Sequence, residues 1–184
     1  MIIELRQYTL HPGQRDVLID LFESTFIEPQ LAAGMQIPGT FRDLDDPDRF
    51  VWFRTFPDME ARKEALTTFY TSPVWLAHRD AANATMIDSD NVLLLRPVDE
   101  RLAFPARLDG NTLHLTIHEL GRHTADVPQA ANQPLLRTEP AANSYPRLPV
   151  RENESVLVSF TTDDLGLPVQ QRLRLAPTAK SNLR

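Results

Sequence analysis

The chain has 184 residues, 42% of them hydrophobic and 24% charged, so it can bury a core and is not a disordered or low-complexity protein. Its net charge is -6 and its Lys and Arg residues are scattered, which argues against nucleic acid as a partner, because binding to a phosphate backbone depends on clustered cations. The chain has no cysteine, which excludes disulfides, thiolate zinc sites and a cysteine nucleophile. It shows neither a signal-peptide pattern nor an apolar run long enough to span a bilayer, so we expect a cytoplasmic protein with no membrane partner.

The chain begins with a predicted strand followed by a predicted helix. Residues 2–10 alternate and are rich in residues that suit a pleated sheet, which is typical of a strand. From Gln14 onward apolar residues recur at helical spacing. We expect Pro29 to kink or end this helix and Gly34 to stop it.

A hairpin, a second helix and a fourth strand follow. Residues 35–46 and 49–56 predict two strands, and the short acidic turn between them predicts that they pair. Residues 59–86 predict a helix that breaks near Ser72-Pro73, where a Ser cap followed by Pro restarts it. Residues 91–98 predict the last strand. The order β-α-β-β-α-β is the ferredoxin-like arrangement, which carries both helices on one face of its sheet.

The rest of the chain contains a weak repeat of this first part. Residues 112–120 resemble the first strand, ESVLVSF resembles DRFVWFRTF, and residues 172–177 resemble residues 93–98. The intervening segments 121–133 and 161–171 are too short and proline-interrupted for full helices. The sequence therefore predicts a ferredoxin-like half at 1–98, a linker at 99–110 and an abbreviated second half at 111–184.

Three stretches carry a resemblance to a known family: ELRQYTLHPGQ, GTFRDLDDPDRFVWFRTFPDMEARKEALTTFYTSPVW and, in the second half, RTEPAANSYPRLPVRENESVLVSF. With them the chain resembles the NIPSNAP family of the dimeric α+β barrel superfamily. The resemblance implies an α+β fold, in which one ferredoxin-like half packs face to face with a second sheet. That sheet comes from another chain or from the same one, and the two enclose a barrel-like cavity. Relatives include cofactor-free monooxygenases, haem-degrading enzymes and haem-binding dehydratases, whereas NIPSNAP proteins mostly lack an assigned reaction.

The alternation of the strands sorts their residues into two faces. We expect one face to pack on the helices, and it contains Ile3, Leu5, Val51, Phe53, Leu93 and Leu95. We expect the other to face the cavity, with Arg42 able to join it, and it contains Glu4, Arg6, Tyr8, Phe50, Trp52, Arg54, Leu94 and Arg96. Arginine forks among apolar walls would suit a carboxylate, enolate or phosphate group. The alternative is that Glu4 pairs with Arg6 or Arg54 and merely closes an interface.

Two histidines add a further candidate site. His114 and His118 share one face of a predicted strand, roughly 13 Å apart, which is too far for both to bind one metal. We therefore predict no metal site. Either histidine could serve as a proton shuttle or haem ligand, although a packed or solvent-facing role is the default. The candidate ligand-binding residues are Arg6, Tyr8, Arg42, Trp52, Arg54, Arg96, His114 and His118.

Two functions remain open from the sequence. The first is a protein that binds a small anionic or aromatic molecule in the barrel cavity, in the manner of a cofactor-independent monooxygenase. The second is a non-catalytic module that uses the same face to dimerise, and haem binding is a third and weaker alternative. On each of the first two we expect a homodimer, because a thin second half would leave the first sheet for another chain to cover.

Overall fold

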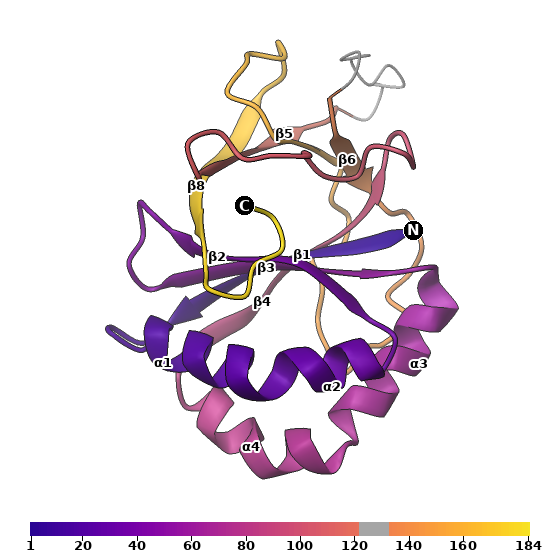
Figure 1. Cartoon of the computed structure of the whole chain (residues 1–184). Helices are drawn as coiled ribbons and strands as arrows, with labels where there is room; N and C mark the ends of the chain where they lie inside the picture. The colour runs from indigo at the N-terminus through magenta and orange to yellow at the C-terminus, as the bar shows by residue number, and fades with distance from the viewer. Residues whose placement is uncertain (122–132) are drawn as a thin grey trace.

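The computed structural model describes residues 1–121 and 133–184 (Figure 1). Within these ranges the strands close one barrel in the order β1-β3-β2-β8-β5-β7-β6-β4, and the neighbours pair antiparallel. The strands are β1 (Ile2–Leu10), β2 (Gln36–Asp43), β3 (Arg49–Phe56), β4 (Met86–Pro97), β5 (Leu113–Glu119), β6 (Leu135–Thr138), β7 (Val156–Ser159) and β8 (Val169–Pro177).

The barrel consists of two halves with the same strand order. The first half runs β4-β1-β3-β2 and the second runs β8-β5-β7-β6, so the order of the four strands recurs along the chain. The halves join where β2 pairs with β8 and where β4 pairs with β6. The two sheets that were expected to pack face to face therefore belong to one chain. The first sheet is therefore covered by the second half, and the argument that another chain must cover it no longer applies. The homodimer stays a prediction.

Among the described residues, the helices lie on the first half, on the face of its sheet that is turned away from the second half (Figure 1). They are α1 (Arg15–Leu21), the π-helix η1 (Phe22–Phe26), α2 (Ile27–Ala32), α3 (Met59–Tyr70) and α4 (Pro73–Asn83). Asp58 caps α3 by accepting hydrogen bonds from two backbone amides, and Ser72 caps α4 with Pro73 at the first helical position. The predicted break between these two helices is confirmed. No helix of the described ranges is long and apolar enough to cross a bilayer.

The first helical segment does not end at Pro29, which lies inside α2. The backbone widens just before it, where the N–H of Ile27 donates to the carbonyl of Phe22, five residues back. Proline cannot donate to the carbonyl four residues before it and crowds that carbonyl, so a wider turn here lets the helix continue past Pro29. The segment ends at Ala32, and Gly34 follows with φ +95°, in agreement with the predicted stop.

The second half keeps its strands without full helices where the structure describes it. Residues 161–171 contain turns and the start of β8, as predicted. The other segment that was expected to lack a full helix, 121–133, falls almost wholly on residues 122–132, which lie outside the described residues.

The predicted assignment of the two faces is wrong. Ile3 and Leu5 pack inside the barrel with apolar residues of the second half, whereas Tyr8 and Trp52 pack against the helices. The interior of an eight-stranded barrel is just wide enough to be filled by side chains, so it takes the more apolar of the two faces. The linker closes one end, where the ring of Phe104 lies 5.3 Å from that of Phe53. The barrel interior is thus packed core, and the candidate site lies on the outer, helix-covered face of the first half.

Candidate functional site

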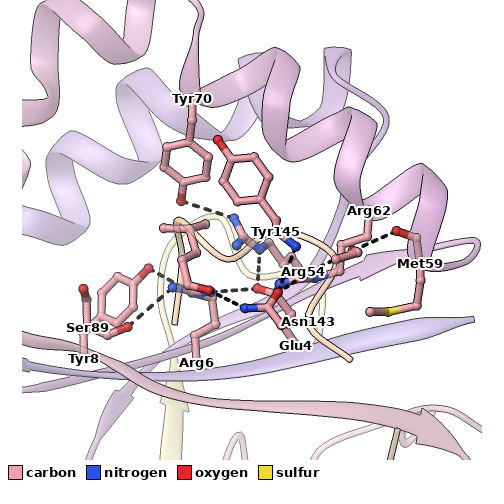
Figure 2. Close-up of polar contacts among 12 residues, drawn as sticks. Glu4, Arg6, Tyr8, Arg54, Met59, Arg62, Tyr70, Ser89, Asn143 and Tyr145 are labelled. Atoms are coloured by element: carbon pink, nitrogen blue, oxygen red, sulfur yellow. Dashed lines mark hydrogen bonds and ion pairs between the residues drawn. The ribbon is translucent and has the colours of Figure 1, made fainter. Parts of the chain in front are cut away.

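Four charged side chains meet between the sheet of the first half and its helices (Figure 2). Glu4 and Arg6 come from β1, Arg54 comes from β3 and Arg62 comes from α3. Each is at most 2% exposed. Glu4 lies directly opposite Arg54 in the pairing of β1 with β3, so the strand register brings two of the charges together. We call these four residues the arginine cluster.

Glu4 binds all three guanidinium groups. Its Oε2 accepts from Arg6 Nη1 at 2.7 Å and from Arg54 Nε at 2.6 Å, and its Oε1 accepts from Arg62 Nε at 2.6 Å. Charge-assisted hydrogen bonds of this length are among the stronger polar contacts in proteins. The pairing of Glu4 with Arg6 or Arg54, which the sequence offered as an alternative, therefore occurs with both arginines. The additional pair with Arg62 connects α3 to the sheet.

The segment between β6 and β7 supplies further contacts to Arg62. Its Nη1 donates to Asn143 Oδ1 at 3.0 Å and to Ser144 Oγ at 3.1 Å, and Ser144 in turn donates to the carbonyl of Met59. The next residue, Tyr145, stacks its ring on that of Tyr70 with centroids 6.2 Å apart. The second half thus covers the site through one loop, although its own strands lie across the barrel.

Two tyrosine hydroxyls complete the polar surroundings. Arg6 Nε donates to the hydroxyl of Tyr8 at 3.0 Å, and Arg54 Nη1 donates to that of Tyr70 at 3.4 Å. Burial raises the pKa of Tyr8, so its phenol keeps its proton at neutral pH and can still donate it to a further acceptor.

The charges of the cluster stay ionised. Burial by itself would raise the pKa of the Glu4 carboxyl, but Arg54, Arg6 and Arg62 lower it well below its usual range. Burial lowers the pKa of Arg62, whereas for Arg6 the effect of burial is outweighed by Tyr8 and Glu4, and its pKa lies above its usual value. Arginine titrates so far above neutrality that all three guanidinium groups remain charged. One carboxylate therefore faces three buried cations.

The cluster also contains donors that no described residue accepts. Arg54 Nη2 and Arg62 Nη2 are buried and have no hydrogen-bond partner within the described ranges. Buried polar groups are nearly always hydrogen-bonded, so an unpartnered guanidinium N–H marks a position where an acceptor fits. With two positive charges in excess and two free donors, the arrangement can bind an anion.

Trp52 forms an aromatic wall beside the cations. The guanidinium carbons of Arg6 and Arg54 lie 5.7 Å and 5.3 Å from the centre of its ring. Contacts of this length are favourable because the face of an indole ring is electron-rich. Arg6, Tyr8, Trp52 and Arg54, four of the residues selected from the sequence, are thus brought together, although on the opposite face from the one predicted.

The structure places the other four predicted residues elsewhere. Arg42 is at the surface and pairs with Asp16 at 2.8 Å, and Arg96 is partly exposed near Glu139. His114 and His118 lie on β5 in the second half, where His118 Nε2 is 3.0 Å from Ser159 Oγ in a buried contact. Any haem bound through either histidine would lie away from the arginine cluster, and haem binding stays a prediction. No group of three or more metal-ligating side chains occurs among the described residues.

Sequence reasoning missed Arg62, although a signal for it exists. In α3 the buried positions include 62, 65, 66 and 69, at helical spacing, so a charged residue falls within an otherwise apolar stripe. Charged side chains are almost never fully buried without a partner, and Arg62 could have been added on that ground. Asn143 and Ser144 carry no such signal, because they lie in a loop far along the chain.

Comparisons with known proteins show what the first half of the chain is similar to. The model of the NIPSNAP family matches residues 3–100, and no match was found among curated proteins. A solved structure of an Agrobacterium tumefaciens protein is similar at 21% identity and a TM-score of 0.50, over 53% of this chain and 94% of that chain. A NIPSNAP family protein from the same organism is similar at 19% identity and a TM-score of 0.50, over 53% of this chain and 93% of that chain.

A weaker likeness extends to a structure from Nitrosomonas europaea that bears the name of an antibiotic biosynthesis monooxygenase. It covers 51% of this chain and 95% of that chain, at 17% identity and a TM-score of 0.42. A likeness at this level carries no argument about the reaction of this chain. The two Agrobacterium tumefaciens structures support the fold of the first half alone.

Proposed function

The chain belongs to the NIPSNAP family, and from this premise we propose that it binds a small anionic molecule at the arginine cluster. The observation that carries the proposal is the charge balance of three buried guanidinium groups against one carboxylate. A buried charge without a counter-charge is costly, and a bound carboxylate, enolate or phosphate would neutralise the excess. A network that served stability alone would need no surplus of cations.

The free donors give the anion a specific place. Arg54 Nη2 and Arg62 Nη2 come from different elements and both belong to side chains already held at Glu4 by their Nε atoms. Guanidinium groups held in this way lose little further freedom when they bind an acceptor. The hydroxyls of Tyr8 and Tyr70 lie at the edge of the cluster and can donate to the same anion.

A cavity lies beside the segment that covers the cluster. It has a volume of about 330 Å³ and lies between β4 and the segment that links β6 to β7, with Asn143 in its wall. Asn143 is also the residue that accepts from Arg62, so a ligand arriving through this cavity would compete for the same guanidinium group. The carboxylate of Glu154, in the same wall, is paired with Arg151 at 2.7 Å.

The enzymatic form of this proposal is a cofactor-independent, monooxygenase-like reaction. An oxygenation without a cofactor requires the substrate itself to donate electrons, and enolates and phenolates are electron-rich anions of that kind. Buried guanidinium groups stabilise such anions, because charge-assisted hydrogen bonds are strong where water is excluded. Uptake of dissolved oxygen on addition of a bound acid would support this form, and a ligand that binds without oxygen uptake would leave binding as the function.

Thermal shift with acetate, benzoate and inorganic phosphate tests the proposal. An anion at about one hundred times its dissociation constant adds about 2.7 kcal/mol to the free energy of unfolding. That gain would raise the Tm of a chain of this length by roughly 5–10 °C. In Arg54→Met the shift should disappear, while the free energy of unfolding without ligand stays within about 1 kcal/mol of wild type, because Glu4 keeps two partners and the excess charge falls.

Arg42→Met is the matched control, because it removes an arginine that pairs with Asp16 at the surface. It should keep the full shift. The opposite result is an unresponsive wild type together with an Arg54→Met variant that loses about 3–5 kcal/mol, the cost of breaking a buried pair. That result would make the cluster purely structural and would favour the non-catalytic assembly module.

A further inference from the structure

A second, smaller cavity lies on the same face of the sheet as the arginine cluster. It has a volume of about 30 Å³ and is lined by aromatic side chains from β3 and from three helices, which include Phe22, Phe26, Trp52, Phe69 and Trp75. Tyr8 and Tyr70, whose hydroxyls accept from Arg6 and Arg54, line it as well. The same two tyrosines and Trp52 contact Arg6 and Arg54, so the aromatic cavity adjoins the arginine cluster.

Two buried polar atoms in the wall of this cavity lack partners among the described residues. Trp52 Nε1 is a donor and Gln30 Oε1 is an acceptor, and both residues are at most 2% exposed. The amide nitrogen of Gln30 donates to the carbonyl of Phe26 at 3.2 Å, which holds the side chain in place. A hydroxyl group both accepts and donates, so it offers the acceptor that Trp52 Nε1 lacks and the donor that Gln30 Oε1 lacks.

Part of the helical wall of the cavity is a π-helix in place of an α-helix. Phe22 and Phe26 are the first and last residues of the π-helix η1, and the ring of Phe22 lies 4.7 Å from that of Trp52. Short π-helices occur frequently at functional sites. A cavity of 30 Å³ holds a group the size of one water, whereas a benzene-sized ligand needs about 150 Å³, so a ring could enter only if this wall moves outward.

We propose that the aromatic cavity holds the ring of a hydroxylated aromatic acid, with its hydroxyl between Trp52 Nε1 and Gln30 Oε1 and its anionic group at the arginine cluster. This inference rests on the proposed function, which requires only an anion. It adds the class of the ligand and two residues that select it. A site built to hydrogen-bond a hydroxyl discriminates strongly against the analogue that lacks it, because the buried partners are then left unpaired.

Titrations with acetate, benzoate and the three isomeric hydroxybenzoates test the inference. The chain has two tryptophans, and both line the cavity, so their fluorescence reports directly on a ring that enters it. We expect one hydroxybenzoate isomer to bind at least about tenfold more tightly than benzoate, which corresponds to about one good hydrogen bond. In Gln30→Leu this ratio should fall toward one, because the hydroxyl loses the acceptor and benzoate no longer leaves that acceptor unpaired.

The control is Gln36→Leu, which replaces an exposed glutamine of β2 and should keep the ratio of wild type. If Gln30→Leu gives little folded protein, Trp52→Phe removes the donor from the same cavity and must abolish the preference in the same way. The inference is overturned if wild type binds benzoate as tightly as every hydroxybenzoate, or if the preference survives in Gln30→Leu. It is also overturned by a crystal structure of the complex in which a water bridges Gln30 and Trp52 and the ring lies elsewhere.

The two proposals fail in different ways. If acetate and benzoate bind and depend on Arg54 but the hydroxyl adds nothing, the anion site stands and the hydroxyl subsite falls. If no acid binds to wild type, the anion site falls and the inference about the ring falls with it.

Discussion

Glu4 is the carboxylate that pairs with the three arginines buried under the helices. It is fully buried, and its two oxygens accept from Arg6, Arg54 and Arg62 at 2.6–2.7 Å. Any one of these guanidinium groups would be expensive to bury alone. Without the carboxylate the cluster would contain three cations and no counter-charge.

We predict that Glu4→Gln lowers the free energy of unfolding by about 3–5 kcal/mol at pH 7, the usual cost of breaking a buried ion pair. The arginines depress the pKa of Glu4 in the folded protein, so the stability that it contributes is fully present above its unfolded pKa of about 4.3 and is lost as pH falls toward the depressed value. Urea unfolding of wild type and variant at pH 7, 5 and 3 should therefore show their difference shrinking only at the lowest pH.

Glu60→Gln is the control, because Glu60 is exposed and its contact with Lys63 is 3.9 Å long. This change should cost less than about 0.5 kcal/mol at every pH, as exposed pairs usually do. A difference between wild type and Glu4→Gln that stays constant from pH 7 to 3 would contradict the depressed pKa of Glu4.

At the scale of elements, β2 shows how a strand with a Pro-Gly pair can remain in a closed barrel. Its pairing with β3 changes register between Gln36 and Gly39, and only beyond Gly39 is the ladder regular. An ideal Cβ on Gly39 would lie 2.5 Å from the ring atoms Cε2 and Cζ of Phe41. Phe41 is fully buried and its ring lies 6.2 Å from that of Phe53, so it has little room to move.

We predict that Gly39→Ala costs about 1–3 kcal/mol through overpacking. The cost should fall below about 0.5 kcal/mol when Gly39→Ala is made in a Phe41→Leu background, because the ring that the new methyl group meets is gone. A double-mutant cycle by urea unfolding measures this coupling. Equal costs in the two backgrounds would show that the close contact with Phe41 does not limit the strand.

At the scale of the whole molecule, the two halves meet through a partly buried amide pair as well as through apolar packing. Gln7 of β1 and Gln171 of β8 each donate to the side-chain oxygen of the other at 3.0 Å. They share faces with Leu5 and Leu173, which belong to the core of the barrel. The pair therefore spans the interior from one half to the other.

We predict that Gln7→Leu alone lowers the free energy of unfolding by about 1–3 kcal/mol, because it leaves the Gln171 amide in the barrel without its partner. The double variant Gln7→Leu/Gln171→Leu should recover most of this loss, since two apolar groups then replace two partners. Thermal or urea unfolding of the three proteins gives the coupling. Additive losses would contradict direct contact between the halves at this position.

Much of the local structure could be predicted from the sequence. The strand at residues 2–10, the hairpin through residues 49–56 and the helix break at Ser72-Pro73 all occur where the alternation, the turn residues and the caps indicated. The repeat also appears in the matching strand order of the two halves. These features depend on short-range rules of backbone geometry, which a sequence displays directly.

The sequence by itself determined which residues share a face, and it correctly grouped Arg6 with Tyr8 and Trp52 with Arg54. Only the tertiary structure decided which face turns inward, because both faces of β1 and β3 are apolar enough to be covered. The barrel interior has room only for side chains and contains the more apolar face, so the face with Glu4, Arg6 and Arg54 lies under the helices. Arg62 of α3 and Asn143 of a distant loop complete the site on the covered face. The sequence did not indicate this part of the site, because no local pattern relates either residue to Glu4.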